Sequence, residues 1–167
     1  MKSTIALLIG CIIAGTARAE EPSGCDKFKW PVDNDRTLLT SKGMPTMASG
    51  SSVASLLPVA VKLALEPFAA AKLPLAPERT PRRPASFAGF IRVPAPAHGG
   101  TYKVSVSSDA WIDVVQNGRL VKSRAFTGAR DCEGIRKSVK FDLKAEPFVV
   151  QLSNVASSSI TLAISGD

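Results

Sequence analysis

Residues 111–126 read WIDVVQNGRLVKSRAF and indicate the fold more clearly than any other stretch of this 167-residue chain. Asn117-Gly118 lies between residues 111–116, which are rich in β-branched residues, and residues 119–126, and Asn-Gly is the pair most typical of a two-residue type I′ turn. Such a turn fixes the register of an antiparallel hairpin. The predicted opposite pairs are Gln116 with Arg119, Val115 with Leu120, Val114 with Val121, Asp113 with Lys122, Ile112 with Ser123 and Trp111 with Arg124.

The two faces of this hairpin differ in character, because directly opposed residues share a face. The face that suits a core is small and apolar and holds Ile112, Val114, Val121, Ser123 and Ala125. The other face holds Trp111, Asp113, Val115, Leu120, Lys122 and Arg124. A flat aromatic ring flanked by charged hydrogen-bonding groups suits a sugar, so the candidate ligand-binding residues are Trp111, Asp113, Lys122 and Arg124. Two alternatives stay open: Trp111 is buried under the N-terminal segment, or the register differs.

Alternating apolar residues continue on both sides of the hairpin and predict further short strands. The predicted strands are residues 56–65, 87–93, 101–107, 110–116, 119–126, 135–143, 148–153 and 159–165. A helix over 55–71 competes with the first of them, but Pro58 and Pro67 argue against a long helix. About eight short strands with frequent turns predict an all-β, antiparallel β-sandwich of jelly-roll-like type with an irregular N-terminal arm.

The run Gly100-Thr101-Tyr102-Lys103-Val104-Ser105-Val106, followed by Trp111-Ile112-Asp113-Val114 and a final apolar strand, resembles the small β-sandwich modules of secreted bacterial proteins. Carbohydrate-binding and pre-peptidase C-terminal modules are of this type. The resemblance covers about residues 86–165. It implies a module that binds sugars or assists secretion, and it carries over no ligand residue.

The N-terminus has the pattern of a secretory signal peptide over residues 1–19. Lys2 precedes an apolar run, and Ala17-Arg18-Ala19 forms an A-x-A cleavage site. The run is too short to span a membrane, so no transmembrane anchor is expected in the mature chain. The alternative is a lipoprotein signal with Cys11 lipidated. We therefore expect an exported protein, periplasmic or extracellular.

Cleavage would remove Cys11 and leave two cysteines, Cys25 and Cys132. Two cysteines in an exported protein are best explained as a disulfide, since there is no C-x-x-C motif and one histidine cannot complete a metal shell. The bond would fasten an irregular N-terminal arm, residues 20–52, to a single sandwich domain, residues 53–167.

Residues 74–84 form a connector framed by prolines, which we expect to be extended and exposed. Arg79, Arg82 and Arg83 lie in it and are candidate anion-contacting residues. The alternative is a solvated link between two sheet edges.

No motif points to catalysis, a cofactor or a metal. There is no G-x-S-x-G or S-x-x-K sequence, and His98 lies in a predicted loop. The pairs Asp109 with Asp113 and Asp131 with Glu133 keep a glycosidase open as a minor alternative.

The chain carries a net charge of +7, which falls to +5 if Lys2 and Arg18 leave with the signal peptide. Export and the lack of a nucleic-acid-binding motif argue against a nucleic-acid partner. Positive charge outside the cytoplasm suits an acidic glycan or another envelope component. We expect a non-enzymatic binding module, with an accessory subunit that docks a protein partner as the alternative.

Overall fold

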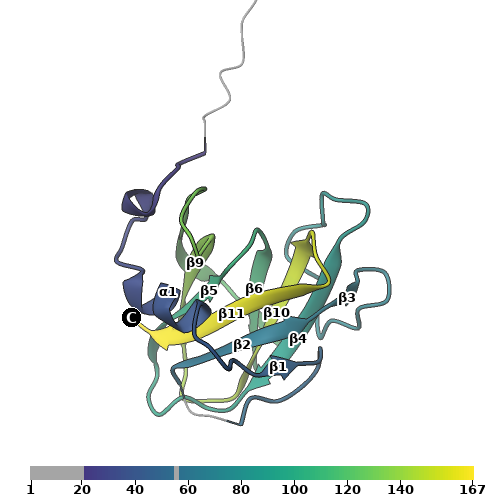
Figure 1. Ribbon diagram of the computed structural model, residues 1–167. Coiled ribbons are helices and arrows are strands. Elements are labelled where there is room, and N and C mark those ends of the chain that lie inside the picture. The colour runs from purple at the N-terminus through teal and green to yellow at the C-terminus, as the bar shows by residue number, and fades with distance from the viewer. Residues whose placement is uncertain (1–20, 55–56) are drawn as a thin grey trace, which may run out of the picture.

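The computed structural model describes residues 21–54 and 57–167, so the predicted signal peptide and Cys11 lie outside the described residues. Two β-sheets pack face to face (Figure 1). The six-stranded sheet has the order β1-β2-β11-β5-β9-β8 and the five-stranded sheet the order β3-β4-β10-β6-β7. The strands are β1 (Thr46–Met47), β2 (Val59–Ala64), β3 (Glu66–Pro67), β4 (Phe87–Val93), β5 (Gly100–Val106), β6 (Trp111–Gln116), β7 (Arg119–Val121), β8 (Ser123–Gly128), β9 (Lys137–Leu143), β10 (Phe148–Val155) and β11 (Ser159–Gly166).

The predicted all-β sandwich is confirmed. Four strands of one sheet, in the order β2-β11-β5-β9, face four of the other, in the order β4-β10-β6-β7, with the chain crossing between sheets as in a jelly roll. Within the predicted strand, Val59–Ala64 form β2, so these residues are not part of the competing helix.

The turn at Asn117-Gly118 has the predicted geometry, with φ of 54° and 70° at its two residues. The register is confirmed for the three pairs nearest the turn, from Gln116↔Arg119 to Val114↔Val121.

Beyond Val121 the prediction is wrong, because residues 119–126 do not form one strand. β7 ends at Val121, and the chain crosses to the other sheet, where β8 pairs with β9. Ser123 therefore lies opposite Phe141 instead of Ile112. Residues 120–126 read LVKSRAF, in which apolar and polar residues do not alternate, so the sequence gave little support for one continuous strand there.

The core lies between the sheets and is built from the alternate residues of facing strands. Its largest fully buried side chains include Phe141, Leu63, Ile91, Leu152 and Leu162. Burying a side chain of this size stabilises the fold by roughly 1.5–3 kcal/mol.

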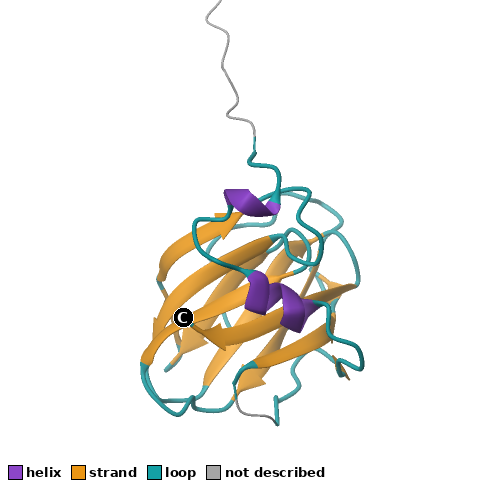
Figure 2. Ribbon diagram, turned by 60° about the vertical axis from the view of Figure 1, so that its left-hand side comes forward, coloured by secondary structure: helices purple, strands orange, loops and turns teal. Residues whose placement is uncertain are grey.

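The N-terminal arm is more ordered than predicted. It holds a short 3-10 helix, Cys25–Lys27, and α1, Asp33–Leu39, which lies across the outer face of the six-stranded sheet (Figure 2). Val32 and Leu39 pack there against Ala163. The buried Asp35 accepts a hydrogen bond from Ser165 Oγ at 2.7 Å.

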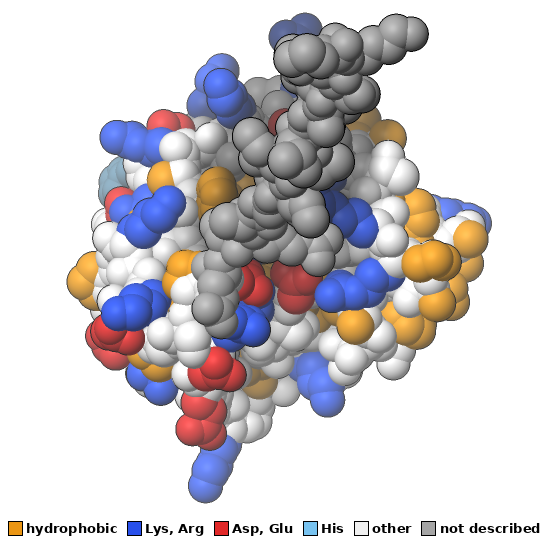
Figure 3. All heavy atoms as spheres, turned by 90° about the horizontal axis from the view of Figure 1, so that it is seen from above, with side chains coloured by type: hydrophobic (Ala, Val, Ile, Leu, Met, Phe, Trp, Pro, Cys, Tyr) orange, Lys and Arg blue, Asp and Glu red, His pale blue; other side chains and the backbone are white. Residues whose placement is uncertain are grey.

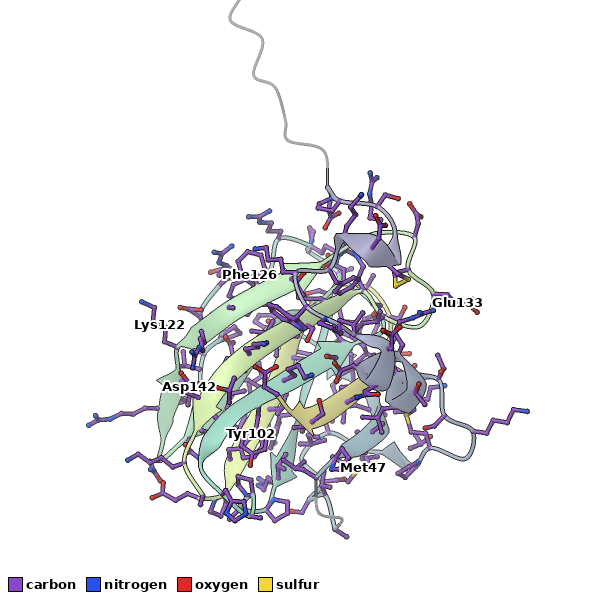
Figure 4. All side chains as sticks on the ribbon, turned by 90° about the vertical axis from the view of Figure 1, so that its left-hand side faces the viewer. Met47, Tyr102, Lys122, Phe126, Glu133 and Asp142 are labelled. Carbon is purple, nitrogen blue, oxygen red and sulfur yellow. A yellow bond between two sulfur atoms is a disulfide. The ribbon has the colours of Figure 1, made fainter. Side chains whose placement is uncertain are left out.

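The disulfide between Cys25 and Cys132 is confirmed, with 4.8 Å between the Cα atoms. Figure 4 shows the sulfur–sulfur bond beside the loop that carries Glu133, between β8 and β9. Backbone hydrogen bonds run alongside it, from Gly24 N to Arg130 O and from Arg130 N to Pro22 O. The arm is thus fixed to the sandwich just after β8, as predicted.

The connector covers part of the outer face of the five-stranded sheet. Gln151, on β10, donates to Leu75 O and accepts from Leu75 N. Asp113, on β6, accepts from Glu78 N at 3.3 Å. The connector is therefore attached to the sheet by hydrogen bonds, which a freely solvated link would not be, and it lies over the start of β6.

Candidate functional site

The candidate site lies at the end of the sandwich where β6 and β9 begin and β10 ends, the upper end in Figure 1. Figure 3 views this end and shows Lys and Arg side chains distributed around it. Trp111, the first residue of β6, is half-buried at the centre of the site.

Trp111 is held by contacts on its ring and on its nitrogen. The guanidinium of Arg79 lies over the ring, 4.3 Å from its centroid, and Lys137 Nζ lies 5.6 Å from it. The indole Nε1 donates to Asp113 Oδ1 at 2.8 Å. The ring is therefore already engaged by the Arg79 cation.

A basic cleft of about 310 Å³ opens on one side of Trp111. Its lining residues are Arg79, Thr80, Arg82, Arg83, Asp109, Ala110, Trp111, Lys137 and Asn154. Four side chains are cationic and one is a carboxylate, Asp109, which pairs with Arg83 at 3.3 Å. Arg79 and Arg82 are exposed. Clefts lined by one sign of charge concentrate ions of the other sign, so this one suits an anion.

Asn154 positions the arginines. It lies where the pairing of β10 with β4 shifts register, between Leu152 and Val155, and has a φ of 58°. Its Oδ1 accepts from Arg82 N at 3.0 Å and Arg83 N at 3.2 Å. Its carbonyl accepts from Arg83 Nη1 at 2.8 Å. This irregularity in β10 therefore fixes the path of the connector over the site.

A second cleft, the inter-sheet slot, opens on the other side of Trp111 and has a volume of about 270 Å³. Its walls come from both sheets. The apolar and aromatic wall residues are Ile112, Val121, Phe126, Val139 and Phe141, and the charged ones are Glu21, Glu78, Arg79, Asp109, Asp113 and Lys137. The cleft and the slot thus share Trp111 and its charged neighbours.

Burial shifts the pKa of two groups at this junction. Desolvation raises the pKa of Asp113, although hydrogen bonds from Trp111, Gln151 and Glu78 N act in the opposite direction. Desolvation also lowers the pKa of Lys137, against the attraction of Asp109. Lys137 Nζ donates to Ala110 O at 2.8 Å. A bound anion would oppose the shift at Lys137 by favouring its charged form.

The structure brings together Trp111, Asp113 and the three connector arginines, which the sequence presented as two separate candidate sites. It separates Lys122 and Arg124 from them, so the predicted pairs Asp113–Lys122 and Trp111–Arg124 are wrong. Arg124 instead bonds Asp142 Oδ1 at 3.1 Å on the six-stranded sheet. Asp142 lies on β9, next to the edge strand β8 that carries Arg124 (Figure 4). The physical reason is the crossing between β7 and β8.

The alternative that Trp111 lies buried under the N-terminal arm is also wrong. The arm places Trp30, not Trp111, among its packing contacts, with Lys140 Nζ lying 4.6 Å from the Trp30 ring centroid. The part of the arm that carries α1 covers the outer face of the six-stranded sheet, whereas the connector lies on the outer face of the five-stranded sheet.

Sequence reasoning missed two residues of the site, Lys137 and Asn154. Lys137 was detectable as the one charge on the apolar face of residues 135–143. Asn154 gave no signal, because its role depends on the irregular pairing of β10.

One member of each carboxylate pair suggested by the sequence is engaged in another contact. Asp109 pairs with Arg83, and Asp131 Oδ2 accepts from Ser23 Oγ at 2.5 Å. Within residues 21–54 and 57–167, no group of three or more His, Cys, Asp or Glu side chains could hold a metal ion. The same residues form no helix long and apolar enough to cross a membrane.

Comparisons of the chain with protein-family models, with curated proteins and with solved structures find no match.

Proposed function

We propose that this protein is an exported, non-enzymatic binding module that holds an acidic glycan in the basic cleft beside Trp111. The observation that carries the proposal is the convergence of Arg79, Arg82 and Arg83 with Lys137 around one ordered aromatic ring. Guanidinium groups bind carboxylate, sulfate and phosphate through paired hydrogen bonds, which suits uronic acids and sulfated or phosphorylated sugars.

Because Arg79 occupies the ring of Trp111, the cleft would recognise the ligand by its anionic groups and not by stacking of a sugar on the indole. A ligand that displaced Arg79 would lose that cation–π contact. Selectivity for acidic over neutral glycans follows.

Export is supported by the sequence pattern of residues 1–19 and by the disulfide, which is stable in oxidising compartments. The available ligands would then be envelope or extracellular polymers, and a basic cleft would attract the acidic ones among them.

The proposal is tested by measuring binding of acidic oligosaccharides, with neutral oligosaccharides of equal length as controls, by calorimetry. Arg82→Ala should weaken binding about tenfold or more, since a hydrogen bond to a charged group is lost. Arg124→Ala removes the same charge far from the cleft and should leave affinity within about twofold. Equal losses in the two variants, or equal binding of acidic and neutral sugars, would refute the proposed cleft.

A protein-docking role is the second candidate, and one observation favours it. Phe126 is 62% exposed on β8, which ends the six-stranded sheet, and its ring meets Lys29 Nζ at 5.1 Å. Exposed aromatics are typical anchors of protein interfaces. A hetero-complex that forms with the wild type and fails to form with Phe126→Ser would support this role, and a complex unaffected by the change would contradict it.

A further inference from the structure

The inter-sheet slot differs chemically from the basic cleft beside it. Its inner walls are apolar, with Ile112 and Val139 each only 6% exposed, and three aromatic rings line it, those of Trp111, Phe126 and Phe141. A volume of about 270 Å³ greatly exceeds the roughly 15 Å³ that one water molecule needs. The slot therefore has room for a small organic group.

The charges around the slot are mainly negative. Four carboxylates line it, from Glu21, Glu78, Asp109 and Asp113, against the two cations Arg79 and Lys137. Most of these groups already have partners: Glu21 pairs with Arg136 and Asp109 with Arg83.

Glu78 is the carboxylate best placed to take a ligand. It is exposed, and its side chain makes no ion pair within the described part of the chain. Its own backbone N–H donates to Asp113, which holds the residue at the slot. Carboxylates beside aromatic rings provide the chemistry that recognises ammonium and alkylammonium groups.

The slot and the basic cleft meet at Trp111, with Arg79, Asp109 and Lys137 common to both. A ligand with one charged group could use only one of them. A ligand with an anion next to a cation could use both, each group facing side chains of opposite charge.

We propose that the site recognises a zwitterion, a phosphate ester that carries an ammonium group, with the phosphate in the basic cleft and the ammonium group in the inter-sheet slot. This inference rests on the proposed function and narrows it to glycans substituted with such esters. Phosphoethanolamine and phosphocholine share this chemistry.

Four probes separate the contribution of the phosphate from that of the ammonium group in a calorimetric or NMR titration of the purified protein. Propyl phosphate supplies the phosphate with an uncharged tail, choline supplies the cation alone, and phosphoethanolamine and phosphocholine supply both groups. At least one zwitterion should bind about fivefold or more tightly than propyl phosphate, and choline alone should bind weakest.

Glu78→Gln should remove the advantage of the zwitterion while leaving the affinity for propyl phosphate within about twofold. Glu133→Gln, a loop carboxylate away from both clefts, is the matched control and should retain the advantage. Arg82→Ala should weaken binding of all three phosphates.

Equal binding of propyl phosphate and both zwitterions would overturn this inference, while acidic oligosaccharide binding would still support the proposed function. An advantage that persists in Glu78→Gln would also overturn it, because the ammonium group would then lie elsewhere. Failure of every anion to bind would instead refute the proposed function.

Discussion

Replacing Cys25 and Cys132 together by alanine removes the disulfide between the N-terminal arm and the loop after β8. The two residues are 107 positions apart, so the bond closes most of the described chain into a loop. In the chain-entropy model, freeing a loop of this length lowers the free energy of unfolding by about 4.8 kcal/mol. For a protein of this size the midpoint of thermal unfolding should fall by roughly 10–20 °C.

The native fold should survive the change, because other contacts hold the arm in place. Lys29 N donates to Thr127 Oγ1 at 2.9 Å, and Arg36 Nε donates to Glu133 O at 3.1 Å. Alanine also keeps the buried position of Cys132 apolar. The β-rich circular dichroism spectrum should therefore resemble that of the wild type.

Denaturant unfolding of the double variant, with reduced wild-type protein as a control, measures the loss in free energy of unfolding. The double variant and the reduced wild type should give closely similar free energies, since each lacks the disulfide. A loss below about 1 kcal/mol would refute the reasoning, as would a variant without native β structure.

Three further changes test the site and the sandwich that carries it. Asn154→Ala should lower the free energy of unfolding by about 1 kcal/mol more than Asn154→Gly, because both remove the acceptor for Arg82 N and only alanine opposes the positive φ; equal losses in denaturant unfolding would contradict this. Burial raises the pKa of Asp113, so its carboxyl binds a proton more readily in the folded protein and stabilises it at acid pH. The stability of the wild type relative to Asp113→Asn should therefore fall as the pH rises from about 3 to about 6, and a rising difference in thermal unfolding would be evidence against it. Gly89→Ala should cost roughly 1–3 kcal/mol in unfolding free energy, since the new Cβ would lie 2.8 Å from Leu65 Cδ2, and an unchanged midpoint would show that Leu65 moves freely.

The elements predicted best from the sequence were those fixed by local chemistry. Asn117-Gly118 determined both the turn and the first three pairs of its hairpin. The alternation in residues 135–143 and 159–165 identified strands β9 and β11. The disulfide was predicted from the cysteine count. Two cysteines that remain in an oxidising compartment pair with each other, so this prediction needs no knowledge of the fold.

The elements that were missed depend on contacts far along the chain. α1 has seven residues, too few for a clear helical period, and its order comes from packing on β11 and β2. The crossing after Val121 is identified by the partner strand, because β8 pairs with β9 and not with β6.

The candidate site could be recognised only once the fold was known, because it joins two distant segments of the chain. The connector arginines are about thirty positions from Trp111, and no periodicity relates the two segments. Hydrogen bonds between the connector and Asp113, Gln151 and Asn154 join them. A sequence pattern could suggest that each segment binds a ligand, but not that they form one cleft.

An NMR titration with an acidic oligosaccharide, recorded on ¹⁵N-labelled protein, tests the central claim most directly. The predicted result is a set of shifts confined to the indole N–H of Trp111 and to the amides of Arg79, Thr80, Arg82, Arg83 and Asn154, with the signals of Lys122 and Arg124 unmoved. Shifts confined to the edge of the six-stranded sheet around Arg124, or no shifts at all, would contradict it.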